Sequence, residues 1–159
     1  MKSIVVLLLM LFPVFSDNKR VGDFSLPNVE NHIQSYNDLK GSNITIIDFW
    51  ATWCKPCVHA IPKLNELYKA YDSEKVQFIG INVDGPRNLS KVRPFIQALG
   101  VEYPVLLDTD QEVMLRLNVS ALPTLLIANN KDEIVYIHEG YQPGDEKLIH
   151  EEIEKLLQD

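Results

Sequence analysis

The chain of 159 residues contains two cysteines, Cys54 and Cys57, separated by Lys55 and Pro56. Thiols at this spacing can exchange disulfides, because a thiolate on the first attacks a disulfide of another protein and the second displaces the mixed disulfide. A helix N-terminus favours such a thiolate, since its unpaired N–H groups and the positive end of its dipole stabilise the anion. We therefore expect Cys54 at a helix start with an exposed sulfur, and Cys57 shielded one turn inside. Pro56 suits the first turn of that helix, where no N–H is needed.

Two other uses of the cysteine pair fit the sequence less well. A structural disulfide across so short a loop would constrain little of the unfolded chain. A zinc site needs about four ligands, and the remaining candidates are histidines with no pair at ligand spacing: His32, His59, His138 and His150. The sequence also has no nucleotide or flavin motif, so we expect redox chemistry without a cofactor or metal.

The cysteine pair lies where a predicted strand passes into a predicted helix. Residues 45–50 form a short apolar run, as in a central strand buried on both faces, and apolar residues recur at helical spacing over 57–71. Further strands are predicted at 24–26, 33–36, 76–83, 103–107, 124–128 and 134–138, and further helices at 37–41, 90–99, 110–117 and 145–157. Ser90, Asp110 and Asp145 are the predicted helix starts. This alternation predicts an α/β fold, a central mixed sheet with helices on both faces.

The N-terminus has the composition of a secretory signal. Lys2 precedes an apolar run over residues 4–15, and Ser16 is a small residue before a possible cut at Asp17. The run is shorter than the roughly 20 residues of a membrane-spanning helix. We expect a signal peptide over 1–16 and one domain over 17–159, in the periplasm or otherwise outside the cytoplasm. An uncleaved membrane tether and a buried N-terminal helix are the alternatives.

The charge of the chain argues against nucleic acid as a partner. Lys and Arg number 15 against 22 Asp and Glu, which gives a formal net charge of −7, and the sequence has no long basic run. With 46% hydrophobic residues, the composition is that of an ordinary globular protein rather than a disordered chain.

Asp48 interrupts the apolar strand that precedes the cysteines. A buried carboxylate is unfavourable unless it is protonated or hydrogen-bonded, so we expect its pKa to be raised. Two roles fit this residue: a proton acceptor near Cys57, or a hydrogen-bonded structural acid.

The segment DFWATWCKPC, residues 48–57, resembles the active-site segment of thioredoxins. The wider chain, over residues 21–157, resembles the extracytoplasmic TlpA/ResA-type thiol-disulfide oxidoreductases. The likeness rests on four further motifs: VGDF at 21–24, DLKG at 38–41, PVLLD at 104–108 and LPT at 122–124. It implies a thioredoxin-like fold with short N-terminal strands and an inserted helix–strand segment.

The resemblance also implies an activity and a set of site residues. The protein would exchange disulfides with extracytoplasmic proteins, as a reductase such as those of cytochrome c maturation, and a membrane electron donor would re-reduce it. The bond before Pro123 would be cis, although only about 5–6% of such bonds are cis in folded proteins. Its backbone at Leu122 would then dock an extended substrate beside Cys54. Trp53 and Pro56 are the other expected substrate contacts.

The sequence departs from these families at two positions. Ala60 stands where the TlpA/ResA-type proteins commonly have Glu, and Gly80 stands where thioredoxins have a Lys beside the buried acid. Two other functions stay open. A thiol peroxidase would separate its threonine from a lone reactive cysteine by two residues, whereas only Trp53 separates Thr52 from Cys54. A non-catalytic thioredoxin-like binding module would not need the cysteine pair.

Overall fold

The computed structural model describes residues 19–158, so the predicted signal peptide over 1–16 lies outside the described residues. Five strands form the central sheet in the order β5 (Val105–Leu107), β4 (Val76–Asn82), β3 (Ile44–Trp50), β6 (Thr124–Asn129) and β7 (Ile134–Glu139). Strands β3, β4 and β5 are parallel, whereas β6 runs antiparallel to β3 and β7 antiparallel to β6. The sheet is therefore mixed, as predicted.

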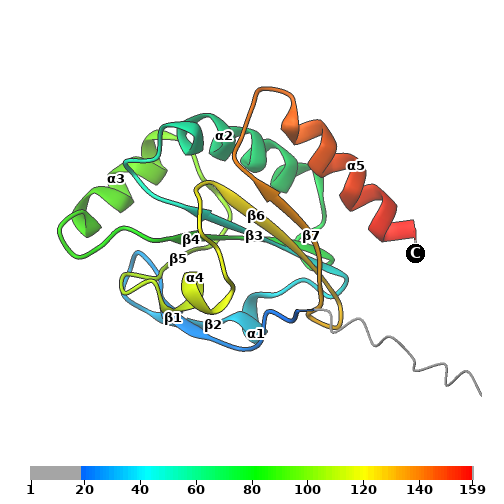
Figure 1. Ribbon diagram of the computed structural model, residues 1–159, viewed down its shortest axis with the longest axis horizontal. Helices are drawn as coiled ribbons and strands as arrows, with labels where there is room; N and C mark the ends of the chain where they lie inside the picture. The colour runs from blue at the N-terminus through cyan, green and yellow to red at the C-terminus, as the bar shows by residue number, and fades with distance from the viewer. Residues whose placement is uncertain (1–18, 159) are drawn as a thin grey trace, which may run out of the picture.

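Helices cover both faces of this sheet (Figure 1). One face carries α2 (Lys55–Ala70), α3 (Leu89–Ala98) and α5 (Asp145–Gln158). The other carries α1 (Tyr36–Leu39), α4 (Glu112–Arg116) and a two-stranded antiparallel sheet of β1 (Ser25–Pro27) and β2 (Ile33–Ser35). Strand β3 lies at the centre, and all seven of its residues are buried. Because helices cover both faces of the sheet, β3 needs apolar residues on both of its faces.

Two predicted helix starts are wrong. Helix α3 begins at Leu89, one residue before Ser90, and its preceding residue makes no side-chain cap. The carboxylate of Asp108 holds the start of α4, accepting hydrogen bonds from the amides of Val113 at 3.2 Å and Met114 at 2.8 Å. Asp110, the predicted cap, accepts a longer hydrogen bond of 3.3 Å from the amide of Glu112, the first residue of α4. Helix α5 begins at Asp145 as predicted.

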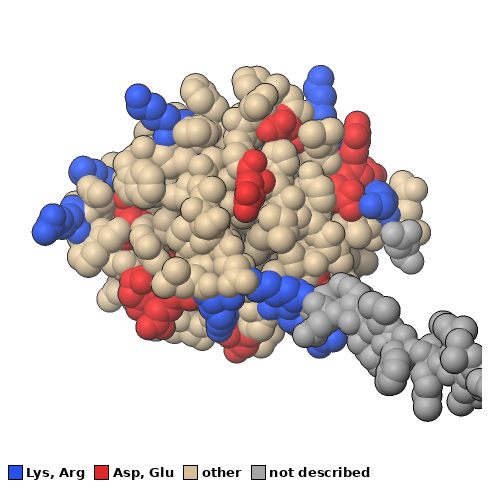
Figure 2. Space-filling view, in the orientation of Figure 1, with Lys and Arg blue, Asp and Glu red and all other residues tan. Residues whose placement is uncertain are grey.

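The surface carries both signs of charge. On the face shown in Figure 2, Lys and Arg side chains lie mainly toward the outline of the molecule and alternate with Asp and Glu. Within residues 19–158, no helix combines the length and the apolar character that crossing a membrane requires.

Candidate active site

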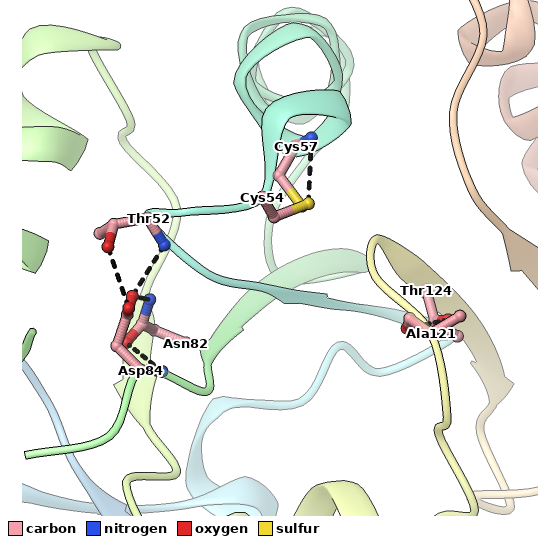
Figure 3. The surroundings of a disulfide bond; sticks show 7 residues. All are labelled: Thr52, Cys54, Cys57, Asn82, Asp84, Ala121 and Thr124. Atoms are coloured by element: carbon pink, nitrogen blue, oxygen red, sulfur yellow. Dashed lines mark hydrogen bonds between the residues drawn. A yellow bond between two sulfur atoms is a disulfide. The ribbon is translucent and has the colours of Figure 1, made fainter.

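Cys54 and Cys57 form a disulfide at the first turn of α2 (Figure 3). Cys54 precedes the helix in an extended conformation, with φ −82° and ψ 101°, and its sulfur accepts a hydrogen bond from the Cys57 amide at 3.3 Å. Pro56 lies in the first turn, where its missing N–H breaks no helical bond. The strand-to-helix placement predicted for the pair is confirmed, and the positive end of the helix dipole lies at Cys54.

The two sulfurs differ in access less than expected. Cys57 is fully buried and Cys54 is 4% exposed. Cys54 is therefore the more accessible of the two, as predicted, but the prediction that its sulfur is exposed is wrong. In the disulfide state neighbouring atoms cover most of Cys54, and the residue lines a surface groove.

That groove has a volume of about 460 Å³ and runs beside Cys54. Besides Cys54 it is lined by Trp53, Lys55, Pro56, Val83, Gln111, Met114, Ser120, Ala121 and Leu122. Trp53 is 61% exposed at its edge. The structure thus brings together three of the predicted substrate contacts, Trp53, Pro56 and Leu122. The predictions missed Gln111 and Met114, which belong to the inserted segment around α4 and carry no sequence signal of their own.

The loop before β6 forms one wall of the groove. The Leu122–Pro123 bond is cis, as the resemblance implied. The Thr124 hydroxyl donates to the Ala121 carbonyl at 2.8 Å and closes this loop (Figure 3). Pro123 itself is buried and borders a second cavity rather than the groove.

The second cavity, of about 10 Å³, is lined by Asp48. Its other lining residues come from α2, β6, β7 and the segment through α5: Ala60, Leu64, Pro123, Leu125, His138, Gly140, Tyr141 and Ile149. Ala60 lies one turn after Cys57 and is buried as Cys57 is, so Asp48 shares this cavity with the turn of α2 that follows the cysteines. The small side chain of Ala60 borders this space on the α2 side.

Burial dominates the electrostatics of Asp48. The residue is 3% exposed, and neither carboxyl oxygen has a hydrogen-bond partner among the described residues. Removal from water disfavours the ionised form and raises the pKa of Asp48 from its ordinary 3.8 to about 7. The predicted raised pKa is confirmed, and the carboxyl group can gain or lose a proton near neutral pH.

A second buried acid, Asp84, holds the segment that leads into the cysteines (Figure 3). Its carboxylate accepts from the Thr52 amide at 2.8 Å, the Thr52 hydroxyl at 2.9 Å and the Asn82 side-chain amide at 2.8 Å. Asp84 lies two residues after the end of β4, and its fully buried carboxylate ties that strand to the loop between β3 and α2. The sequence predictions missed the role of Asp84. The available signal was its position just after a predicted parallel strand, at the edge of the sheet where the cysteines also lie.

Comparison with known proteins agrees with this geometry. The ResA thiol-disulfide oxidoreductase of Bacillus subtilis is 32% identical over 86% of this chain and 73% of its own length. That of Geobacillus kaustophilus is 31% identical over the same shares. The solved structure of StoA from Bacillus subtilis superposes with a TM-score of 0.68 at 27% identity, covering 82% of this chain and 95% of that one.

The redox pair and these relatives together identify a thiol-disulfide oxidoreductase with a thioredoxin-like fold. The sequence profile of the AhpC/TSA family matches residues 12–137, and the chain belongs to that family as one of its ResA-like members.

Proposed function

We propose that this protein reduces disulfides of extracytoplasmic proteins, with Cys54 as the attacking thiol, Cys57 as the resolving thiol and Asp48 as the acceptor of the Cys57 proton. The observation that carries the proposal is the position of Cys54. It lies at the N-terminus of α2 and is the cysteine that borders the groove, whereas Cys57 is fully buried.

Attack by Cys54 follows from where its sulfur can be reached. The helix dipole and the free amides of the first turn favour its thiolate. The Cys54 thiolate would attack one sulfur of a substrate disulfide in the groove. A mixed disulfide between Cys54 and the substrate would form, and the other substrate sulfur would leave as a thiolate. Cys57 then attacks Cys54, the Cys54–Cys57 disulfide forms, and the second substrate sulfur leaves as a thiolate.

The resolving step needs a base, because Cys57 is buried away from water. Asp48 shares a cavity with Ala60, one turn after Cys57 on α2, and a pKa of about 7 keeps a useful share of it ionised at neutral pH. The ionised carboxyl would take the proton of the Cys57 thiol as that sulfur attacks.

Substrate docking is assigned to the groove wall formed by Leu122 and Trp53. An extended peptide beside the loop before β6 would place its disulfide at Cys54, with the broad apolar surface of Trp53 against its side chains. Pro123 would hold this loop from the inside, since it borders the Asp48 cavity.

The direction of exchange follows from the local charges. Lys55, an exposed residue, is the only charged side chain between the cysteines. A solvated charge of this kind contributes about 1 kcal/mol or less, and 1.4 kcal/mol corresponds to about 30 mV for a two-electron couple. Asp48, when ionised, disfavours a nearby thiolate. We therefore expect a reduction potential between about −270 mV and about −180 mV, the range from thioredoxin to protein disulfide isomerase.

The location and partners rest on the sequence. The apolar run over residues 4–15 after Lys2 supports export by a signal peptide or a membrane tether. Outside the cytoplasm the oxidised enzyme would need a membrane electron donor, and a disulfide-containing protein such as apocytochrome c is the expected substrate.

Equilibration of the purified chain in glutathione buffers tests the reductase proposal. The fluorescence of Trp50 and Trp53 would report the fraction reduced, and we expect a potential in the range above. A value near −120 mV, that of the strong oxidant DsbA, would make the protein a disulfide donor instead.

A further inference from the structure

Four buried side-chain polar atoms within residues 19–158 have no hydrogen-bond partner, and they belong to three residues. They are both carboxyl oxygens of Asp48, the Nε1 of Trp50 and the hydroxyl of Tyr103. The three residues are 3%, 1% and 4% exposed. Buried polar groups are nearly always paired, so a cluster of unpaired ones in an otherwise well-bonded domain points to a shared purpose.

All three residues surround the Cα of Gly80. Asp48 on β3 is the direct partner of Gly80 on β4, and Trp50, two residues along β3, faces the same side of the sheet. A Cβ placed on Gly80 would lie 3.0 Å from Cε2 of Tyr103 and 3.1 Å from Nε1 of Trp50. The edge of the Tyr103 ring next to its hydroxyl, and the indole N–H of Trp50, therefore border the small space beside Asp48.

Helix α2 closes this space from above. Tyr68 of α2 meets the Tyr103 ring edge-on at 6.0 Å between centroids, and Phe78 of β4 lies 6.3 Å from it. Trp50 is stacked on Phe95 of α3 at 5.3 Å. These contacts fix the Tyr103 ring against α2 and the Trp50 ring against α3.

The hydrogen-bonding capacities of the three groups are complementary. The indole N–H of Trp50 can only donate, a tyrosine hydroxyl donates once and also accepts, and an ionised carboxylate only accepts. A chain from Trp50 to Tyr103 to Asp48 would satisfy the indole N–H, the hydroxyl and one carboxyl oxygen once Asp48 is ionised. A protonated Asp48 accepts such a bond more weakly.

We propose that Tyr103 is a positioning residue for disulfide exchange, whose hydroxyl donates a hydrogen bond to the ionised carboxylate of Asp48 and is itself oriented by Trp50. The proposal rests on the proposed role of Asp48 as the proton acceptor for Cys57. Gly80 carries no side chain that could supply a charge, so a neutral donor performs the stabilisation.

Tyr103 keeps its own proton throughout the exchange. Burial, together with the nearby charge of Asp48, raises the pKa of Tyr103 well above its ordinary value. The Cys57 thiol gives its proton to Asp48, the Cys57–Cys54 bond forms, and the bond from Cys54 to the substrate sulfur breaks. The electron pair of that bond leaves with the substrate thiolate, and the hydrogen bond from Tyr103 to the now protonated Asp48 weakens.

Other groups also face Asp48, and the test must leave them unchanged. His138 of β7 and Tyr141 of the following loop line the same cavity, and Ala60, one turn after Cys57, lines it from α2. His138 is held by Asp145 at 3.0 Å and by Tyr136 at 3.4 Å, so its ring nitrogens are already engaged on the far side from Tyr103.

Tyr103→Phe tests the proposal, with Tyr68→Phe as the matched control from the same aromatic cluster. The ionisation of Asp48 would be followed by NMR of the carboxyl carbon in the oxidised full chain, and the rate of mixed-disulfide resolution would be followed against pH. We expect Tyr103→Phe to raise the pKa of Asp48 by about one unit, because a hydrogen bond to the charged form is lost. The pH profile of resolution should move by the same amount, and Tyr68→Phe should change neither.

Gly80→Ala provides a second variant that keeps the hydroxyl. Its added methyl must displace the Tyr103 ring edge, so the pKa should shift in the same direction. An unchanged pKa of Asp48 in Tyr103→Phe would overturn the hydrogen bond itself. A shifted pKa with an unmoved rate profile would instead refute Asp48 as the proton acceptor, and with it the positioning role of Tyr103.

Discussion

Thr52 and Asp84 are joined by two hydrogen bonds across 32 residues of sequence, one from the Thr52 amide at 2.8 Å and one from its hydroxyl at 2.9 Å. Each bond uses a different carboxylate oxygen, so the Thr52 backbone is fixed in both position and direction. Since Cys54 follows two residues later, this contact sets where α2 and its cysteines begin.

Thr52→Val should weaken the fold and loosen the approach to Cys54. It removes one of the two bonds and leaves an oxygen of the fully buried Asp84 without that donor, a loss of about 1–3 kcal/mol. Urea unfolding of the oxidised protein would measure the change in the free energy of unfolding. Thr52→Ser keeps the hydroxyl and is the control; equal losses in the two variants would show that the side-chain bond contributes nothing.

Asp48→Asn should stabilise the oxidised protein in a pH-dependent way. The pKa of Asp48 is about 7 in the folded state and near 3.8 in the unfolded state, so the folded state binds more protons between these values. The free energy of unfolding therefore falls as pH rises from about 4 to about 7. This shift in the pKa of Asp48 corresponds to a loss on the order of 4 kcal/mol in the free energy of unfolding. The Asn side chain of the variant cannot ionise, so the variant should not show this pH-dependent loss.

Thermal or urea unfolding of both proteins at a series of pH values checks this prediction. The two stabilities should be similar below pH 4 and diverge up to about pH 7, with the Asn variant the more stable. The same variant should resolve mixed disulfides more slowly near neutral pH. Parallel stability curves would mean that Asp48 finds a partner for its charge in the folded state.

Trp53→Ala should impair exchange with protein disulfides while leaving a small disulfide such as oxidised glutathione nearly unaffected. Trp53 is 61% exposed beside Cys54, so it can contact a long substrate without supporting the core. Exposed substitutions of this kind change stability by about 0.5 kcal/mol or less. Leu115→Ala is the matched control, because Leu115 is 68% exposed on α4 and does not line the groove. Equal rates for both variants on a protein substrate would remove Trp53 from the docking surface.

Much of this architecture is readable in the sequence because short-range signals agree with the fold. The apolar run in β3 fits only a strand buried on both faces, and the spacing of apolar residues after Cys57 fits only a helix with one buried face. The strand, the helix and the junction between them were therefore predicted. Asp48 was also recognisable, since a carboxylate within such a strand has few alternatives to a raised pKa.

Other features depend on contacts that no local pattern encodes. Asp108, rather than Asp110, holds the start of α4, because the chain bends so that the earlier carboxylate reaches the amides of Val113 and Met114. The low exposure of Cys54 likewise results from packing by the groove residues around it. Tyr103 was predicted within a strand, yet β5 begins at Val105 and the tyrosine instead turns its ring over Gly80.

The exchange mechanism itself is tested most directly by the two cysteine variants and a defined protein disulfide. Reduced Cys57→Ser and Cys54→Ser would each be mixed with insulin, and covalent adducts would be counted by mass spectrometry under non-reducing conditions. The account predicts a stable mixed disulfide through Cys54 in Cys57→Ser, no adduct in Cys54→Ser, and no accumulation with the unaltered pair, because Cys57 resolves it. An adduct through Cys57 in the Cys54→Ser variant, formed as fast as that through Cys54, would contradict the assignment of Cys54 as the attacking thiol.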